Sequence, residues 1–89
     1  MDGKIRVVLA DDHTLVRQGI RQFLESDASI EVVGEAAGGE EAIAQVERHR
    51  PDMILLDIQM PGMTGVEATR EISARFPEVK VLILTAHDD

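Results

Sequence analysis

Hydrophobic residues follow two different periods along this chain, one typical of strands and the other of helices. Short apolar runs bounded by polar or turn residues predict four strands, at residues 5–10, 30–36, 53–57 and 80–85. Between them, apolar residues at helical spacing predict three helices, over residues 15–25, 40–49 and 66–76. Strands that alternate with single helices imply right-handed crossovers, and hence a parallel sheet in an α/β layered fold.

The same pattern predicts which side chains face the core. The inward positions are expected to be Leu15, Val16, Gly19, Ile20, Phe23 and Leu24 in the first helix, Ala42, Ile43 and Val46 in the second, and Val66, Thr69, Ile72 and Phe76 in the third. The first helix should open at Asp12, His13 or Thr14, with Asp and Thr the favoured cap types. Residues 53–57 are nearly all apolar and should be covered on both faces, whereas the glutamates in residues 30–36 suggest a sheet edge.

Composition and charge exclude several classes of function. The 89 residues suffice for one domain, and a net charge of −8 repels nucleic acid and anionic membrane surfaces. The chain has two Phe and no Trp or Tyr on which bases could stack, and its apolar runs are far below the roughly twenty residues of a membrane span. With no Cys, disulfides and thiolate zinc sites are excluded. We therefore expect a cytoplasmic protein that by itself binds neither nucleic acid nor membrane.

Acidic residues gather where the predicted strands end. Asp11 and Asp12 end the first strand, Asp57 ends the third, and Thr85 ends the fourth. Ligands of parallel α/β sheets bind beyond the carboxyl ends of the strands. If the strand order is 2-1-3-4, the first and third strands are neighbours about 4.8 Å apart, which crowds three carboxylates together. Such a cluster needs a cation, and oxygen ligands favour a hard divalent ion, with Mg²⁺ preferred.

A carboxylate beside such an ion can attack phosphorus and form an aspartyl phosphate, while a hydroxyl and the metal stabilise the phosphoryl oxygens. Asp57 is the candidate nucleophile because it stands alone at its strand end, facing the acidic pair. Each residue also has a simpler explanation, with Asp12 as a helix cap, Asp57 as a turn residue and Thr85 as an ordinary strand residue. The conjunction of separate segments at one predicted edge favours a site.

Three segments resemble the receiver domain of two-component response regulators. They are Val8-Leu9-Ala10-Asp11-Asp12-His13, the stretch from Leu55 to Gly65 (LLDIQMPGMTG), and Ile83-Leu84-Thr85-Ala86. The segment from Asp11 to Gly19 (DDHTLVRQG) looks specifically like the NarL/FixJ subfamily of transcription regulators.

The resemblance implies a flavodoxin-like three-layer fold with strand order 2-1-3-4-5 and phosphorylation of Asp57 by a sensor histidine kinase. It also implies Mg²⁺ bound by Asp12, Asp57 and the Gln59 backbone carbonyl with help from Asp11, and Thr85 as the switch hydroxyl. Gln59 and His87 fall at positions that tune dephosphorylation in receivers. The implied role is signalling, not enzymatic turnover.

Receivers of this family continue beyond the point where this sequence stops, so we expect residues 1–89 to form a partial receiver domain with no DNA-binding domain. The fourth helix, fifth strand and fifth helix would be missing, together with the lysine that pairs with the phosphoryl group. Phosphorylation would then be impaired, and the fourth strand would be an open apolar edge through which the chain self-associates.

Two other functions stay open. One is a phosphorylation-independent interaction or dimerisation module. The other is an aspartyl-phosphate hydrolase, whose haloacid-dehalogenase type needs an acid two residues after the nucleophile, where this chain has Gln59.

Overall fold

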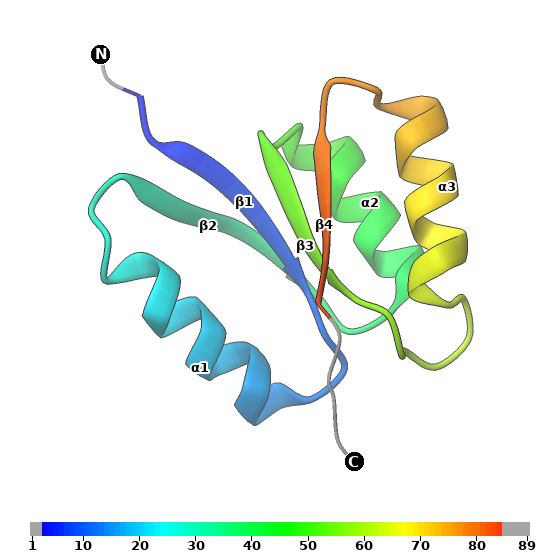
Figure 1. Ribbon diagram of the computed structural model, residues 1–89, viewed down its shortest axis with the longest axis horizontal. Coiled ribbons are helices and arrows are strands. Elements are labelled where there is room, and N and C mark those ends of the chain that lie inside the picture. The colour runs from blue at the N-terminus through cyan, green and yellow to red at the C-terminus, as the bar shows by residue number, and fades with distance from the viewer. Residues whose placement is uncertain (1–2, 85–89) are drawn as a thin grey trace.

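The computed structural model describes residues 3–84, which form a parallel sheet with helices on both faces (Figure 1). The elements are β1 (Ile5–Ala10), α1 (Thr14–Glu25), β2 (Ile30–Ala36), α2 (Gly39–His49), β3 (Met53–Asp57), α3 (Gly65–Arg75) and β4 (Lys80–Leu84). The strand order is β2-β1-β3-β4 with every pairing parallel, which confirms the predicted α/β flavodoxin-like arrangement. No helix within residues 3–84 is long and apolar enough to cross a bilayer.

The larger part of the core lies between the sheet and helices α2 and α3. Ile54 and Leu56 of β3 and Ile72 of α3 are completely buried there, because alternate strand residues point to this face. The other buried members of this cluster are Val8, Ala10, Ala36, Ala42, Ile43, Val46, Met60, Ala68, Phe76 and Val79. The predicted inward face of the second helix is therefore confirmed, as are Ile72 and Phe76 of the third, while Thr69 is half-buried.

The opposite face of the sheet carries a smaller core beneath α1. Val7, Leu9, Val32 and Leu55 are buried, and Ile20 and Leu24 of α1 pack partly against them. None of the α1 residues, all within the described range, is fully buried, and Leu15, Val16 and Phe23 are exposed. The predicted inward set for this helix is thus wrong at those three positions and at Gly19, which is exposed as well. Helical spacing identified an apolar stripe, but the sheet covers only one flank of it.

Ion pairs supplement the sparse apolar contacts of α1. Arg17 Nε donates to Glu35 Oε1 of β2 at 2.8 Å, and Arg21 Nη1 donates to Glu35 Oε2. Burial alone raises the pKa of the Glu35 carboxyl, but the hydrogen bonds from Arg17 and Arg21 outweigh burial and hold this pKa below its ordinary value. Polar contacts thus tie α1 to the sheet edge.

The helix starts differ from the expectations in two details. His13, one of the three residues predicted to open α1, is its N-cap residue, but its side chain makes no capping hydrogen bond, so the preference for an Asp or Thr cap misleads here. At α3, Thr64 and Glu67 form a capping box and the helix begins at Gly65. Val66 is consequently 44% exposed instead of facing inward, and Ala68 takes the buried position on this turn.

Candidate functional site

The end of β1 is held by backbone and side-chain hydrogen bonds around Asp11. Its N–H donates to the carbonyl of Ala36 at 3.0 Å, and its own carbonyl accepts from Arg17 Nη1 at 2.5 Å. The Asp11 carboxylate is buried, and its Oδ1 accepts the backbone N–H of His13 at 2.8 Å. These contacts close the turn into α1 and fix the carboxylate at the strand end.

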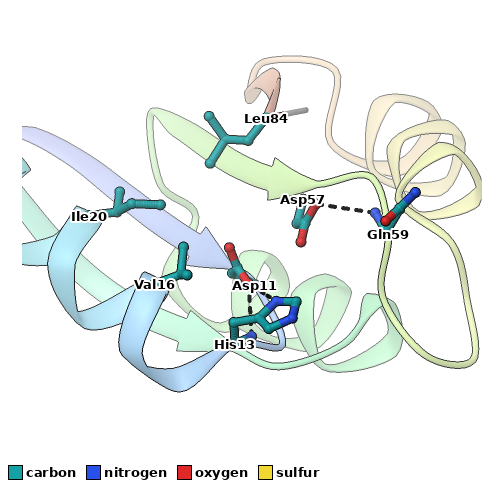
Figure 2. A pocket seen from close by; sticks show the side chains of 7 residues that line it. All are labelled: Asp11, His13, Val16, Ile20, Asp57, Gln59 and Leu84. Carbon is teal, nitrogen blue, oxygen red and sulfur yellow. Dashed lines mark hydrogen bonds and ion pairs between the residues drawn. The ribbon is translucent and has the colours of Figure 1, made fainter. Parts of the chain in front are cut away.

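Asp57 occupies the matching position at the end of β3. In the parallel register Ala10 lies opposite Leu56, so the residues that follow, Asp11 and Asp57, emerge side by side at one edge of the sheet. The Asp57 carboxylate is buried, and its Oδ1 accepts the Gln59 N–H at 3.2 Å. Its other oxygen points toward Asp11 (Figure 2).

The start of α3 also fixes Asp57. Gly65 donates its N–H to the Ile58 carbonyl at 3.0 Å, which folds the loop after β3 back on itself. A Cβ at position 65 would come 2.5 Å from the Asp57 carbonyl oxygen. Only glycine allows the helix to start this close to the strand end.

Asp12 supplies the third carboxylate of the cluster. Its Oδ1 is buried and has no hydrogen-bond partner among the described residues. His13 Nδ1 lies 3.1 Å from that oxygen, without hydrogen-bonding geometry. An unpaired buried carboxylate oxygen is costly unless a cation or water satisfies it.

One potential ligand atom from each of Asp11, Asp12, His13 and Asp57 lies within 4.8 Å of the others. The predicted approach of the three carboxylates is therefore confirmed. Oxygen donors this close, one of them unsatisfied, fit a hard divalent cation such as Mg²⁺, which takes one or two carboxylates and completes its shell with water and phosphate oxygens.

A cavity of about 380 Å³ opens above the acidic cluster (Figure 2). Its polar lining comes from Asp11, His13, Asp57 and Gln59, and its apolar wall from Val16, Ile20 and Leu84. Sequence reasoning missed this wall, although the spacing of Val16 and Ile20 places them on one face of a helix that follows the acidic pair. Electrostatic interactions are stronger beside such a wall than in open water.

Two predicted site features are not placed by the structure. Thr85 and His87 lie outside the described residues. For Gln59 the structure gives the N–H contact with Asp57, and the predicted metal-binding role of its carbonyl stays a prediction.

Comparison with known proteins identifies the family in which this arrangement occurs. The family model described as the response regulator receiver domain matches residues 7–89. The chain belongs to the response regulator receiver family. Receiver domains are mostly signalling modules, they bind Mg²⁺ at an acidic pocket, and response regulators receive phosphate from sensor histidine kinases.

Individual relatives agree with this assignment. The chain is 48% identical over 88 residues to the transcriptional regulatory protein DegU of Brevibacillus brevis, covering 99% of this chain and 37% of that protein. It is 50% identical over 82 residues to the response regulator VraR of Staphylococcus aureus, covering 92% of this chain and 39% of VraR. The receiver therefore spans well under half the length of these curated relatives.

Solved structures share the fold. The signal receiver domain of NarL from Mycobacterium tuberculosis superposes with a TM-score of 0.92 at 40% identity, over 99% of this chain and 71% of that one. A LuxR-family response regulator from Aurantimonas gives 0.91 at 37% identity, over 97% of this chain and 61% of that one. The predicted NarL-type receiver resemblance is confirmed.

Proposed function

We propose that this chain is the phosphoacceptor module of a transcription regulator and that Asp57 accepts a phosphoryl group from a sensor histidine kinase. One observation carries the proposal. The buried Asp57 carboxylate lines a cavity, and one of its oxygens lies within 4.8 Å of a carboxylate oxygen of Asp11 and of Asp12. The names of the relatives, a transcriptional regulatory protein and a response regulator, support this role. We also propose a cytoplasmic location, which is typical of response regulators.

Asp57 would act as the nucleophile. Its Oδ1 is held by the Gln59 N–H, which orients the other oxygen toward the cavity. That oxygen attacks phosphorus, an O–P bond forms, and the P–N bond of the phosphohistidine breaks with its electrons left on the imidazole. Proximity and electrostatics carry most of the catalysis in such transfers.

Asp11, Asp12, Asp57 and the Gln59 backbone carbonyl are the proposed ligands of Mg²⁺. The bound ion supplies positive charge that offsets the carboxylates and the oxygens of the transferred group. Thr85 follows Leu84, which pairs with Asp57, and is proposed as the hydroxyl that interacts with the phosphoryl group. The apolar side chains of Val16, Ile20 and Leu84 form one wall of the cavity.

Incubation with acetyl phosphate and Mg²⁺, followed by intact-mass analysis, tests the proposal. We expect the mass of one phosphoryl group to be added in the wild type and in Asp27→Ala, which removes an exposed carboxylate of the turn after α1. Asp57→Ala should show no addition. Addition that persists in Asp57→Ala contradicts the proposal, and rapid turnover of acetyl phosphate without accumulation would favour the hydrolase.

The exposed side of β4 supports a second function, self-association. Among the described strands β4 pairs only with β3, and Leu82 and Ile83 are 45% and 39% exposed. Unpaired, apolar strand edges recruit other strands, so we propose that a second copy of this chain pairs along β4.

Light scattering at tens of micromolar tests the pairing. We expect a dimer mass for the wild type and a monomer for Leu82→Lys. Phe23→Lys, on the exposed side of α1, serves as the matched control and should remain dimeric. A monomeric wild type, or equal disruption by both variants, contradicts pairing through β4.

A further inference from the structure

A histidine lies at the acidic cluster and has no part in the proposed phosphoryl transfer. The ring of His13 is 67% exposed, and its Nδ1 lies 3.3 Å from Asp11 Oδ1 and 3.1 Å from Asp12 Oδ1. The backbone of this residue is fixed, because its N–H donates to Asp11 and its carbonyl accepts from Arg17 N. The hydrogen bond between His13 Nδ1 and Asp11 Oδ1 places the ring beside two of the three carboxylates.

These separations match the spacing of atoms that share one metal ion. With bonds of about 2.1 Å, two ligand atoms lie about 3.0 Å apart at adjacent octahedral positions and about 3.4 Å apart in a tetrahedron. The two distances from His13 Nδ1 to carboxylate oxygens, 3.1 and 3.3 Å, lie within that range. A single ion could thus contact the imidazole and both aspartates without a large movement of the chain.

Imidazole changes which metals such a site prefers. Carboxylate and carbonyl oxygens suit Mg²⁺, whereas an imidazole nitrogen suits the later first-row metals, whose affinities rise toward Co²⁺, Ni²⁺ and Cu²⁺. Mg²⁺ prefers oxygen ligands and gives up its water reluctantly, so it gains little from the nitrogen. The chain has no Cys, so no thiolate competes for these ions.

We propose that His13 is a selectivity residue of this pocket, a nitrogen ligand that lets the cluster of Asp11, Asp12 and Asp57 bind a transition-metal divalent cation more tightly than Mg²⁺. Mg²⁺ is held by the oxygens alone, and a Co²⁺-class ion adds the His13 nitrogen. The inference rests on the metal site of the proposed function and adds to it a residue that discriminates between two classes of ion.

Calorimetric titrations of Mg²⁺ and Co²⁺ into the wild type, His13→Gln and His49→Gln test the proposal. His13→Gln should weaken Co²⁺ at least about tenfold, the lower end of what perturbing even an outer-shell partner costs, and should change Mg²⁺ affinity by less than about twofold. His49 lies at the end of α2 and serves as a control for adventitious histidine binding, so His49→Gln should leave both affinities unchanged.

The visible absorption of bound Co²⁺ gives a second readout. We expect the Co²⁺ bands of the wild type to shift in His13→Gln and to stay in place in His49→Gln, because only the first variant removes a nitrogen ligand. Circular dichroism checks that the variants are folded. We expect His13→Gln to fold because the His13 ring is largely exposed.

Failure of this inference can be told from failure of the proposed function. Mg²⁺ binding with Co²⁺ affinity and spectrum unaffected by His13→Gln would overturn the selectivity role alone. Absence of binding by either ion would overturn the metal site and this inference together. Equal weakening of Mg²⁺ and Co²⁺ in His13→Gln would also contradict the inference, since a general electrostatic role would affect both ions alike.

Discussion

The two faces of the sheet are built in opposite ways. On the face covered by α2 and α3, Ile54, Leu56 and Ile72 are completely buried in a continuous apolar core. On the face covered by α1, the apolar contacts of the helix with the small core come from Ile20 and Leu24, while Leu15 and Phe23 are 82% and 77% exposed. Because it buries more apolar side chains, we expect the first face to supply most of the stability. The second supplies the side chains beside the acidic cluster, and ion pairs hold its helix in place.

A deletion in the larger core should have the greatest effect. Ile72→Ala removes a completely buried side chain and should lower the free energy of unfolding by about 2–5 kcal/mol. Urea denaturation followed by circular dichroism measures it. If that variant does not fold, Ile72→Val should still fold and lose about 0.5–1.5 kcal/mol. A loss from Ile72→Ala no larger than that of an α1 surface variant would overturn the contrast between the faces.

Removal of the α1 ion pairs should cause the next largest loss of unfolding free energy. Arg17 is largely buried and donates to both Glu35 and the Asp11 carbonyl, so Arg17→Gln should cost about 1.5–3 kcal/mol of unfolding free energy. Arg21→Gln is the matched control, since Arg21 also pairs with Glu35 but is more exposed and should cost at most about 1 kcal/mol. Denaturation in urea with and without added salt compares them. Equal costs would mean that the Asp11 contact contributes nothing.

Acid should weaken the α1 face through Glu35. The pKa of this carboxyl is lowered in the folded chain, so its contribution to stability is present above the unfolded value, about 4.3, and is lost as pH falls through the lower folded value. The stability deficit of Glu35→Gln relative to the wild type should be constant near neutral pH and shrink below about pH 4. Urea denaturation across this range measures it. A deficit that grows as pH falls would contradict the assignment.

The smallest effect is expected on the outer side of α1. Phe23→Ala removes a large side chain that is 77% exposed, so unfolding free energy should change by less than about 0.5 kcal/mol. Thermal denaturation of the wild type and of Phe23→Ala under the same conditions measures this change. A loss of about 3 kcal/mol, typical of a buried Phe, would mean that this surface is covered in solution.

The sequence predicted the first three strands best, because each is a short apolar run bounded by polar or turn residues. Residues 5–10, 30–36 and 53–57 were predicted as strands and form β1, β2 and β3 with the same bounds. Apolar strands that alternate with helices are buried when they form a parallel sheet covered by those helices. The meeting of Asp11, Asp12 and Asp57 followed from that topology, because parallel strands bring their carboxyl ends to one edge.

The predictions that were wrong concern features that depend on local geometry. Helical spacing cannot tell which part of an apolar stripe the sheet will cover, so Leu15, Val16 and Phe23 were placed inward although they are exposed. The capping box of Thr64 and Glu67 starts α3 at Gly65, and this turn leaves Val66 exposed and buries Ala68. The contact of Arg17 with the Asp11 carbonyl depends on side-chain reach, which spacing alone does not show.

The central claim is that carboxylates from two neighbouring strand ends hold one divalent cation, and an Mg²⁺ titration followed by amide nuclear magnetic resonance tests it most directly. We predict saturable shifts concentrated at Asp11 to His13 and Asp57 to Gln59, and their loss in Asp57→Ala. Shifts that do not saturate, or that spread over the exposed acids of the helices and leave these two segments unchanged, would contradict the account.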